Sequence, residues 1–134
     1  SYLKDNGIIF ISFPAWQMPF GGHQQICKSQ ILSHLPFIHL LPTNIYLNLL
    51  KVFKEDEHCI NELKSIKETK CPIELFEKNI RGGYKILDRT LYFINPHYKV
   101  KFGLKPRVLP NFIGRIKYFR NFLTTSTFYI LKKE

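Results

Sequence analysis

The chain has 134 residues, of which 45% are hydrophobic and 22% charged, so it has room for one folded domain and is neither disordered nor collagen-like. Its formal net charge is +10, and residues 97–134 hold nine basic residues against one acidic residue. This excess suggests an acidic partner, although solubilising charge around an apolar loop is the commoner explanation. No segment reaches the roughly 20 apolar residues that cross a bilayer, so no transmembrane segment is expected.

The cysteines and the first residue suggest where the chain works. Cys27, Cys59 and Cys71 include no CxxC pair, so neither a disulfide framework nor a zinc site of the usual spacing is indicated. Such cysteines fit a reducing compartment, and we expect a cytoplasmic protein. The chain begins with Ser1 and carries no signal-peptide pattern, which suggests a piece of a longer protein or a processed product.

The first predicted element is a strand over residues 7–13. This continuous apolar run opens with Gly7 and closes before Pro14, and it predicts a strand buried on both faces, as in parallel sheets. A loop over 14–23 follows. It combines aromatic residues with two glycines, and loops at strand ends often carry function.

Residues 15–67 are predicted to form a helical insertion. Between 24 and 41 the prolines interrupt the pattern and leave one short helix and a turn. After Pro42, apolar residues recur at helical spacing to about residue 66. This pattern predicts one amphipathic helix, or two with a break at residues 55–58.

The remaining elements complete an α/β order. A short helix is predicted after Pro72, which suits a first helical position. Glu74 and Glu77 lie early in this segment, and Gly82 and Gly83 mark its end. Residues 84–94 then predict a strand, and residues 95–123 a long excursion with a helix near 112–121. Residues 124–131 predict a last strand, which gives an α/β chain with three strands.

A polar and aromatic cluster follows the first predicted strand, where open α/β sheets bind their ligands. Its members are Pro14, Trp16, Gln17, Phe20, His23 and Gln24. The aromatic rings would stack on a small acceptor, the two amides would hydrogen-bond to it, and His23 would remove a proton from its attacking oxygen or nitrogen. The alternative is a structural loop that is packed by Trp16 and leaves His23 facing solvent.

A second cluster follows the strand of residues 84–94. Asn95 would orient an acceptor there, and His97 would serve as the alternative base. The structural alternative is a turn that the Asn-Pro pair initiates. We assign His34, His39 and His58 to structure.

Residues 3–14, Leu-Lys-Asp-Asn-Gly followed by an apolar strand and Pro14, resemble the passage that introduces the fifth strand of class I S-adenosylmethionine-dependent methyltransferases. The later elements are similar to that family's C-terminal end in order and spacing. They are the helix at 73–80, the glycine turn at 82–84, the strand at 85–94 and the last strand at 124–131. The resemblance implies a partial Rossmann-like sheet in which the seventh strand is antiparallel and lies between the fifth and the sixth. Residues 124–131 would then pair with both 7–13 and 85–94.

The sequence departs from this family in its cofactor motifs. The family's glycine-rich first loop and the acidic residue ending its second strand have no counterpart here, and Asp5-Asn6 stands where Pro-Gly is usual. The resemblance therefore implies a C-terminal half, with residues 15–67 as a cap over the acceptor. The acceptor would be a small or lipid-like molecule, and S-adenosylmethionine would be held mainly by the missing half. We expect this part alone to be inactive and to self-associate through its apolar edge strand.

A second hypothesis is a module that binds nucleic acid or another anionic surface. It rests on basic residues interleaved with the aromatic residues Tyr98, Phe102, Tyr118 and Phe122, a pattern that suits single-stranded nucleic acid. The basic residues are Lys99, Lys101, Lys105, Arg107, Arg115, Lys117 and Arg120. No known nucleic-acid motif supports the hypothesis, so nucleic acid is the less favoured partner. A methyltransferase with an anionic acceptor would combine both hypotheses.

Overall fold

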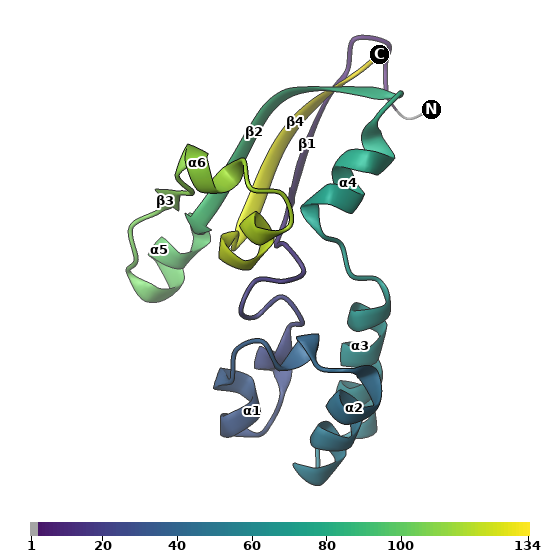
Figure 1. Cartoon of the computed structure of the whole chain (residues 1–134), viewed down its shortest axis with the longest axis vertical. Coiled ribbons are helices and arrows are strands. Elements are labelled where there is room, and N and C mark those ends of the chain that lie inside the picture. Colours follow the sequence, from purple (N-terminus) through teal and green to yellow (C-terminus); the bar gives the residue numbers. More distant parts are fainter. Residues whose placement is uncertain (1–2) are drawn as a thin grey trace. The chain divides into compact units, whose positions relative to one another are not determined.

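A computed structural model describes residues 3–134, which form a mixed α/β structure in two compact units (Figure 1). Unit 1 consists of the chain up to Ala15 and of residues 71–134, and unit 2 of residues 16–70. Unit 2 therefore ends three residues beyond the expected insertion of 15–67. Its role as a cap over an acceptor stays a prediction.

Unit 1 contains a four-stranded antiparallel sheet with the order β1-β4-β2-β3. The strands are β1 (Ile8–Phe13), β2 (Tyr84–Ile94), β3 (Arg107–Val108) and β4 (Ser126–Lys133). β4 lies between β1 and β2 and is antiparallel to both, with Ile11 opposite Tyr129 and Thr90 opposite Phe128. The pairing expected for the last strand is thus confirmed, and the two-residue β3 adds a fourth strand to the predicted three.

One face of this sheet packs against α4 (Ile73–Ile80). The ring of Phe76 lies 4.8 Å from those of both Phe13 and Tyr129. Ile73 belongs to a buried cluster with Leu91, and neither side chain is more than 6% exposed. This face is the core of unit 1.

The opposite face of the sheet is largely open. Phe128 contacts the rings of Phe10 and Tyr92 there, but Ile8 and Phe10 remain 62% and 61% exposed. The prediction that the first strand is buried on both faces is therefore wrong. β1 is an edge strand that pairs only with β4, and its alternate side chains stay in solvent.

Unit 2 is helical and has its own core. It contains η1 (Gln24–Ile26), α1 (Gln30–His34), η2 (Ile38–Leu40), α2 (Thr43–Val52) and α3 (Glu57–Glu68). The helical segment is interrupted between α2 and α3, where the Asp56 side chain accepts the backbone N–H of Cys59 and caps α3. The two-helix interpretation of this segment is therefore confirmed. Leu32, Tyr46, Leu50 and Leu63 form its buried core.

The long excursion of residues 95–123 differs from its prediction. It contains α5 (His97–Phe102), α6 (Asn111–Gly114) and η3 (Phe119–Leu123), so the helix predicted near 112–121 is wrong. Tyr118 adopts a positive φ of 65°, which ends any continuous helix at that point. No helix in the described part of the chain is long and apolar enough to cross a membrane.

Candidate functional site

The predicted acceptor residues are divided between the two units. Pro14, Asn95 and His97 belong to unit 1, at the ends of β1 and β2. The others, Trp16, Gln17, Phe20, His23 and Gln24, belong to unit 2. A common pocket that holds both groups remains a prediction.

Within unit 2, the loop over residues 16–24 is organised around His39. The rings of Trp16 and His39 meet edge to face at 4.7 Å, and His39 Nε2 donates to the Trp16 carbonyl oxygen at 2.8 Å. Gly22 packs so closely on His39 that a Cβ at this position would lie 2.6 Å from His39 Cγ. Gln24 is fully buried, and its Nε2 donates to the carbonyls of Pro19 and Leu35. These contacts hold the loop in one conformation.

His39 is the titratable residue of this cluster that sequence reasoning assigned only to structure. Because Nε2 donates to a carbonyl, the neutral ring carries a lone pair on Nδ1, and that atom is buried with no hydrogen-bond partner in the described part of the chain. Burial lowers the pKa of His39, the hydrogen bond to Trp16 opposes that shift, and Lys67 adds to it. The ring is therefore neutral at physiological pH and accepts hydrogen bonds.

Two further acceptors of the same loop lack partners. The Oε1 atoms of Gln17 and Gln24 are buried and make no hydrogen bond among the residues that the structure describes. Like His39 Nδ1, they find no donor among the described residues, and an unpaired buried acceptor is costly. A ligand that donates hydrogen bonds, such as water, an alcohol or an amine, matches these acceptors.

The other two loop residues are more accessible. Phe20 is half-buried, whereas His23 is exposed in the left-handed region with a φ of 58°. The backbone of His23 is held through its N–H to the Phe20 carbonyl and its carbonyl to the Ile26 N–H. Its side chain is exposed to solvent, which both interpretations of this loop expect.

The second cluster has the geometry of a turn. The Oδ1 atom of Asn95 accepts the backbone N–H of His97 at 3.0 Å and starts α5. This is the contact expected of an Asn-Pro turn. His97 is exposed on the first residue of α5, where its side chain is accessible.

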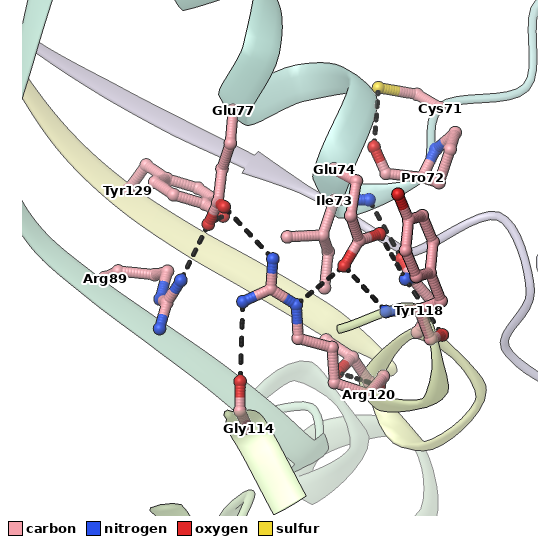
Figure 2. A network of polar contacts seen from close by, with 12 residues as sticks. Cys71, Pro72, Ile73, Glu74, Glu77, Arg89, Gly114, Tyr118, Arg120 and Tyr129 are labelled. Atoms are coloured by element: carbon pink, nitrogen blue, oxygen red, sulfur yellow. Dashed lines mark hydrogen bonds and ion pairs between the residues drawn. The ribbon is translucent and has the colours of Figure 1, made fainter. Parts of the chain in front are cut away.

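A buried polar network in unit 1 was not predicted (Figure 2). The Arg120 side chain is 4% exposed and lies between two carboxylates, with Nε 2.9 Å from Glu74 and Nη2 3.0 Å from Glu77. Glu77 also accepts hydrogen bonds from Arg89 and Tyr129. The network joins η3 to α4 and β4 within unit 1, so its role is structural.

This network corrects the surface proposed for nucleic acid. Arg120 was counted among its basic residues, but it is buried and paired with Glu74 and Glu77. The other six basic residues are exposed, and so are Phe102 and Tyr118 at 60% and 68%. The hypothesis therefore rests on these exposed residues without Arg120.

The strand ends of unit 1 do not fit S-adenosylmethionine. The residues directly after β1 are Pro14 and the fully buried Ala15, and those after β2 are Asn95, whose side chain accepts the His97 N–H, and Pro96. These two turns offer neither a carboxylate for ribose hydroxyls nor a glycine-rich approach for the cofactor backbone. No catalytic step is therefore derived through that cofactor.

The chain was compared with protein-family models, with curated proteins and with solved structures. None of these comparisons found a match.

Proposed function

We propose that the chain is the acceptor-binding part of an S-adenosylmethionine-dependent methyltransferase, with the cofactor bound mainly by residues outside this part. The observation that carries the proposal is the β1-β4-β2 order, in which a central strand is antiparallel to two strands that are parallel to each other. The sequence resemblance implies this order for the fifth, seventh and sixth strands of that family. A partial Rossmann-like sheet is thus part of the proposal.

The free edge of β1 supports the same proposal. In an open sheet, an exposed apolar edge strand is a template for pairing, and natural proteins usually cover it. Ile8 and Phe10 are exposed along this strand. We infer that the cofactor-binding part pairs with β1 and covers the open face of the sheet.

The acceptor would be a small or lipid-like molecule that bears a hydroxyl or an amine. The loop of residues 16–24 supports this choice, because its buried acceptors Gln17, Gln24 and His39 match a ligand that donates hydrogen bonds. Trp16 is buried against His39, so the half-buried Phe20 would supply the aromatic surface. His23 is exposed next to this loop and would take the proton that the acceptor loses.

The test is a methyl-transfer assay with the protein isolated from its own cells. His23→Asn is the chosen variant because asparagine tolerates the left-handed backbone at this position. We expect the turnover number to fall about a hundredfold, as for loss of a general base, while the affinity for S-adenosylmethionine changes less than about twofold.

The matched control for this assay is His34→Asn, which removes another exposed histidine of unit 2. Its turnover number should equal that of the unchanged protein. Equal losses of turnover and cofactor affinity in His23→Asn would show that the loop is structural. Absence of methyl transfer to any hydroxyl- or amine-bearing molecule in a cell extract would contradict the proposed function.

The exposed β1 edge predicts that the isolated chain self-associates. Light scattering over a dilution series should show a dimer that dissociates on dilution, because two copies can join through this edge or through the open face beside it. Phe10→Lys places a charge on that face and should give a folded monomer whose stability falls by about 1 kcal/mol at most, through loss of the ring contact with Phe128. The control Val100→Lys alters an 85% exposed residue of α5 and should still dimerise. A monomeric unchanged chain at all concentrations would refute the prediction.

The second candidate function is binding of an anionic surface. It is favoured by the exposure of Lys99, Lys101 and Arg107 together with Phe112 and Tyr118, whose side chains are 71% and 68% exposed. Tight, salt-dependent binding of a single-stranded oligonucleotide, without methyl transfer, would favour this function over the first.

A further inference from the structure

Two thiols and one carboxylate meet inside unit 2. The ligand atoms of Cys27, Glu55 and Cys59 all lie within 4.8 Å of one another, and all three residues are buried. They come from the end of η1, from the break between α2 and α3, and from the first turn of α3. The site is therefore assembled by the fold and has no short sequence motif.

Surrounding groups orient these ligands. The two carboxylate oxygens of Glu55 accept the backbone N–H groups of Lys28 and Ser29 at 2.9 and 2.8 Å. Each oxygen keeps a second lone pair for another partner. Metal-binding carboxylates are commonly held by such outer hydrogen bonds. Cys59 lies in the first turn of the 12-residue α3, whose backbone fixes its position.

The charge of this cluster is not balanced by a cation. Glu55 is 7% exposed and forms no ion pair among the described residues, while the neighbouring Lys28 pairs with Asp56. Burial and the charge of Glu55 raise the pKa of Cys27. Burial, the charge of Cys27 and the charge of Glu55 raise the pKa of Cys59 to about 12. A bound divalent cation would supply a positive charge beside the buried Glu55 carboxylate.

An orphan hydroxyl group gives independent evidence for a ligand. Tyr46 is fully buried, and its hydroxyl makes no hydrogen bond among the described residues. Tyr46 belongs to the same buried cluster of unit 2 as Cys27 and Cys59. A buried phenol normally has a partner, so a polar group missing from its surroundings is indicated.

We propose that Cys27, Glu55 and Cys59 bind one zinc ion, and that water in the fourth position hydrogen-bonds to Tyr46. Two thiolates select a soft metal, and tetrahedral zinc with bonds of about 2.3 Å to sulfur keeps its ligands about 3.7 Å apart. The ligand atoms lie within 4.8 Å of one another, so the distances between them need to shorten by about 1 Å at most. Both thiols lose their protons to solvent when the ion binds.

The test uses the reduced 134-residue chain and Co²⁺ as a spectroscopic probe. We expect one Co²⁺ per chain with thiolate-to-cobalt charge-transfer absorption, and displacement of Co²⁺ by Zn²⁺ with loss of that band. Calorimetry of Zn²⁺ binding in buffers of different ionisation enthalpy should show the release of about two protons.

Three alanine variants separate the cluster from the rest of the chain. Cys27→Ala and Cys59→Ala keep small apolar side chains in the core, and each should weaken Zn²⁺ binding at least about a hundredfold. Cys71→Ala is the control, because Cys71 belongs to unit 1 and should leave binding unchanged. Circular dichroism establishes that each variant is folded.

Glu55→Gln tests the third ligand and can be measured even if the cysteine variants unfold. It keeps one of the two oxygens that accept the backbone N–H groups of Lys28 and Ser29 and removes the charge, so the charge-transfer band should persist with an affinity about ten- to a hundredfold lower. The proposal is overturned if the reduced chain binds neither metal at micromolar concentration, or if a Cys27–Cys59 disulfide forms and is the only chemistry seen. Unchanged affinity in a folded Cys59→Ala or Glu55→Gln variant would also overturn it.

Discussion

Replacement of Arg120 by methionine is expected to lower the free energy of unfolding by about 3–5 kcal/mol. The variant leaves the carboxylates of Glu74 and Glu77 without their shared cation, and the side chain of each is only 14% exposed. Arg120 also donates to the Gly114 carbonyl, so α6 loses a contact as well. Urea denaturation followed by circular dichroism measures the change.

Two comparisons isolate the cause of this loss. Arg115→Met removes an exposed arginine of the same segment and should change stability by no more than about 0.5 kcal/mol. Adding Glu74→Gln and Glu77→Gln to Arg120→Met should recover part of the loss, because no buried charge is then left unpaired. If Arg120→Met and Arg115→Met proved equally stable, the network would have no structural role.

The same network makes stability depend on pH. Burial alone would raise the pKa of Glu74 and Glu77, but hydrogen bonds and the charge of Arg120 outweigh it and hold both pKa values below the ordinary range. For Glu74 the hydrogen bonds come from Tyr118 and Asn121. A carboxyl with a lowered pKa stabilises the fold above its unfolded-state pKa and loses that effect as the pH falls. Stability should therefore drop below about pH 4 in the unchanged chain, and less steeply in the variant that carries all three substitutions.

Replacement of Gly22 by alanine is expected to destabilise unit 2 by about 2–3 kcal/mol. The new Cβ would overlap His39 Cβ and lie 2.6 Å from its Cγ. His39 has no room to move, because its ring is buried against Trp16 and bound to the Trp16 carbonyl. Trp16 is the only tryptophan of the chain, so its fluorescence during urea denaturation reports directly on this contact.

Gly83→Ala is the matched control for this substitution. A Cβ at Gly83 would meet no atom within 4 Å, and the residue does not need a positive φ. Its alanine variant should be as stable as the unchanged chain or slightly more stable, since alanine restricts the unfolded chain. A Gly22→Ala variant with unchanged stability and fluorescence would mean that the loop does not pack on His39.

Local patterns in the sequence predicted several elements closely. Residues 84–94 form a strand with the predicted bounds, because a turn at Gly82, which has a positive φ of 82°, follows α4 and β-favouring residues come next. α4 likewise lies where Pro72 indicated, although Pro72 is its N-cap and not its first residue. The last strand begins at Ser126, two residues later than predicted. Thr124 is instead buried, with its hydroxyl donating to the Arg120 carbonyl.

Features that depend on distant residues escaped prediction. An apolar run such as Ile8–Phe13 is the same in a central strand and in an edge strand, so the exposure of β1 could not be inferred from it. Arg120 belongs to a basic segment, and only the fold places it between Glu74 and Glu77, more than 40 residues away in sequence. Cys27 and Cys59 lack any motif spacing, and the packing of α3 brings them together.

The most direct measurement of the proposed function is calorimetry with S-adenosylmethionine on two samples, the isolated 134-residue chain and the protein from its own cells. The account predicts no binding at micromolar concentration to the isolated chain, because its strand ends lack a carboxylate and a glycine-rich turn, and micromolar binding to the protein from cells. Micromolar binding to the isolated chain would contradict the assignment of the cofactor site to residues outside it. Absence of binding to both samples would contradict the methyltransferase proposal.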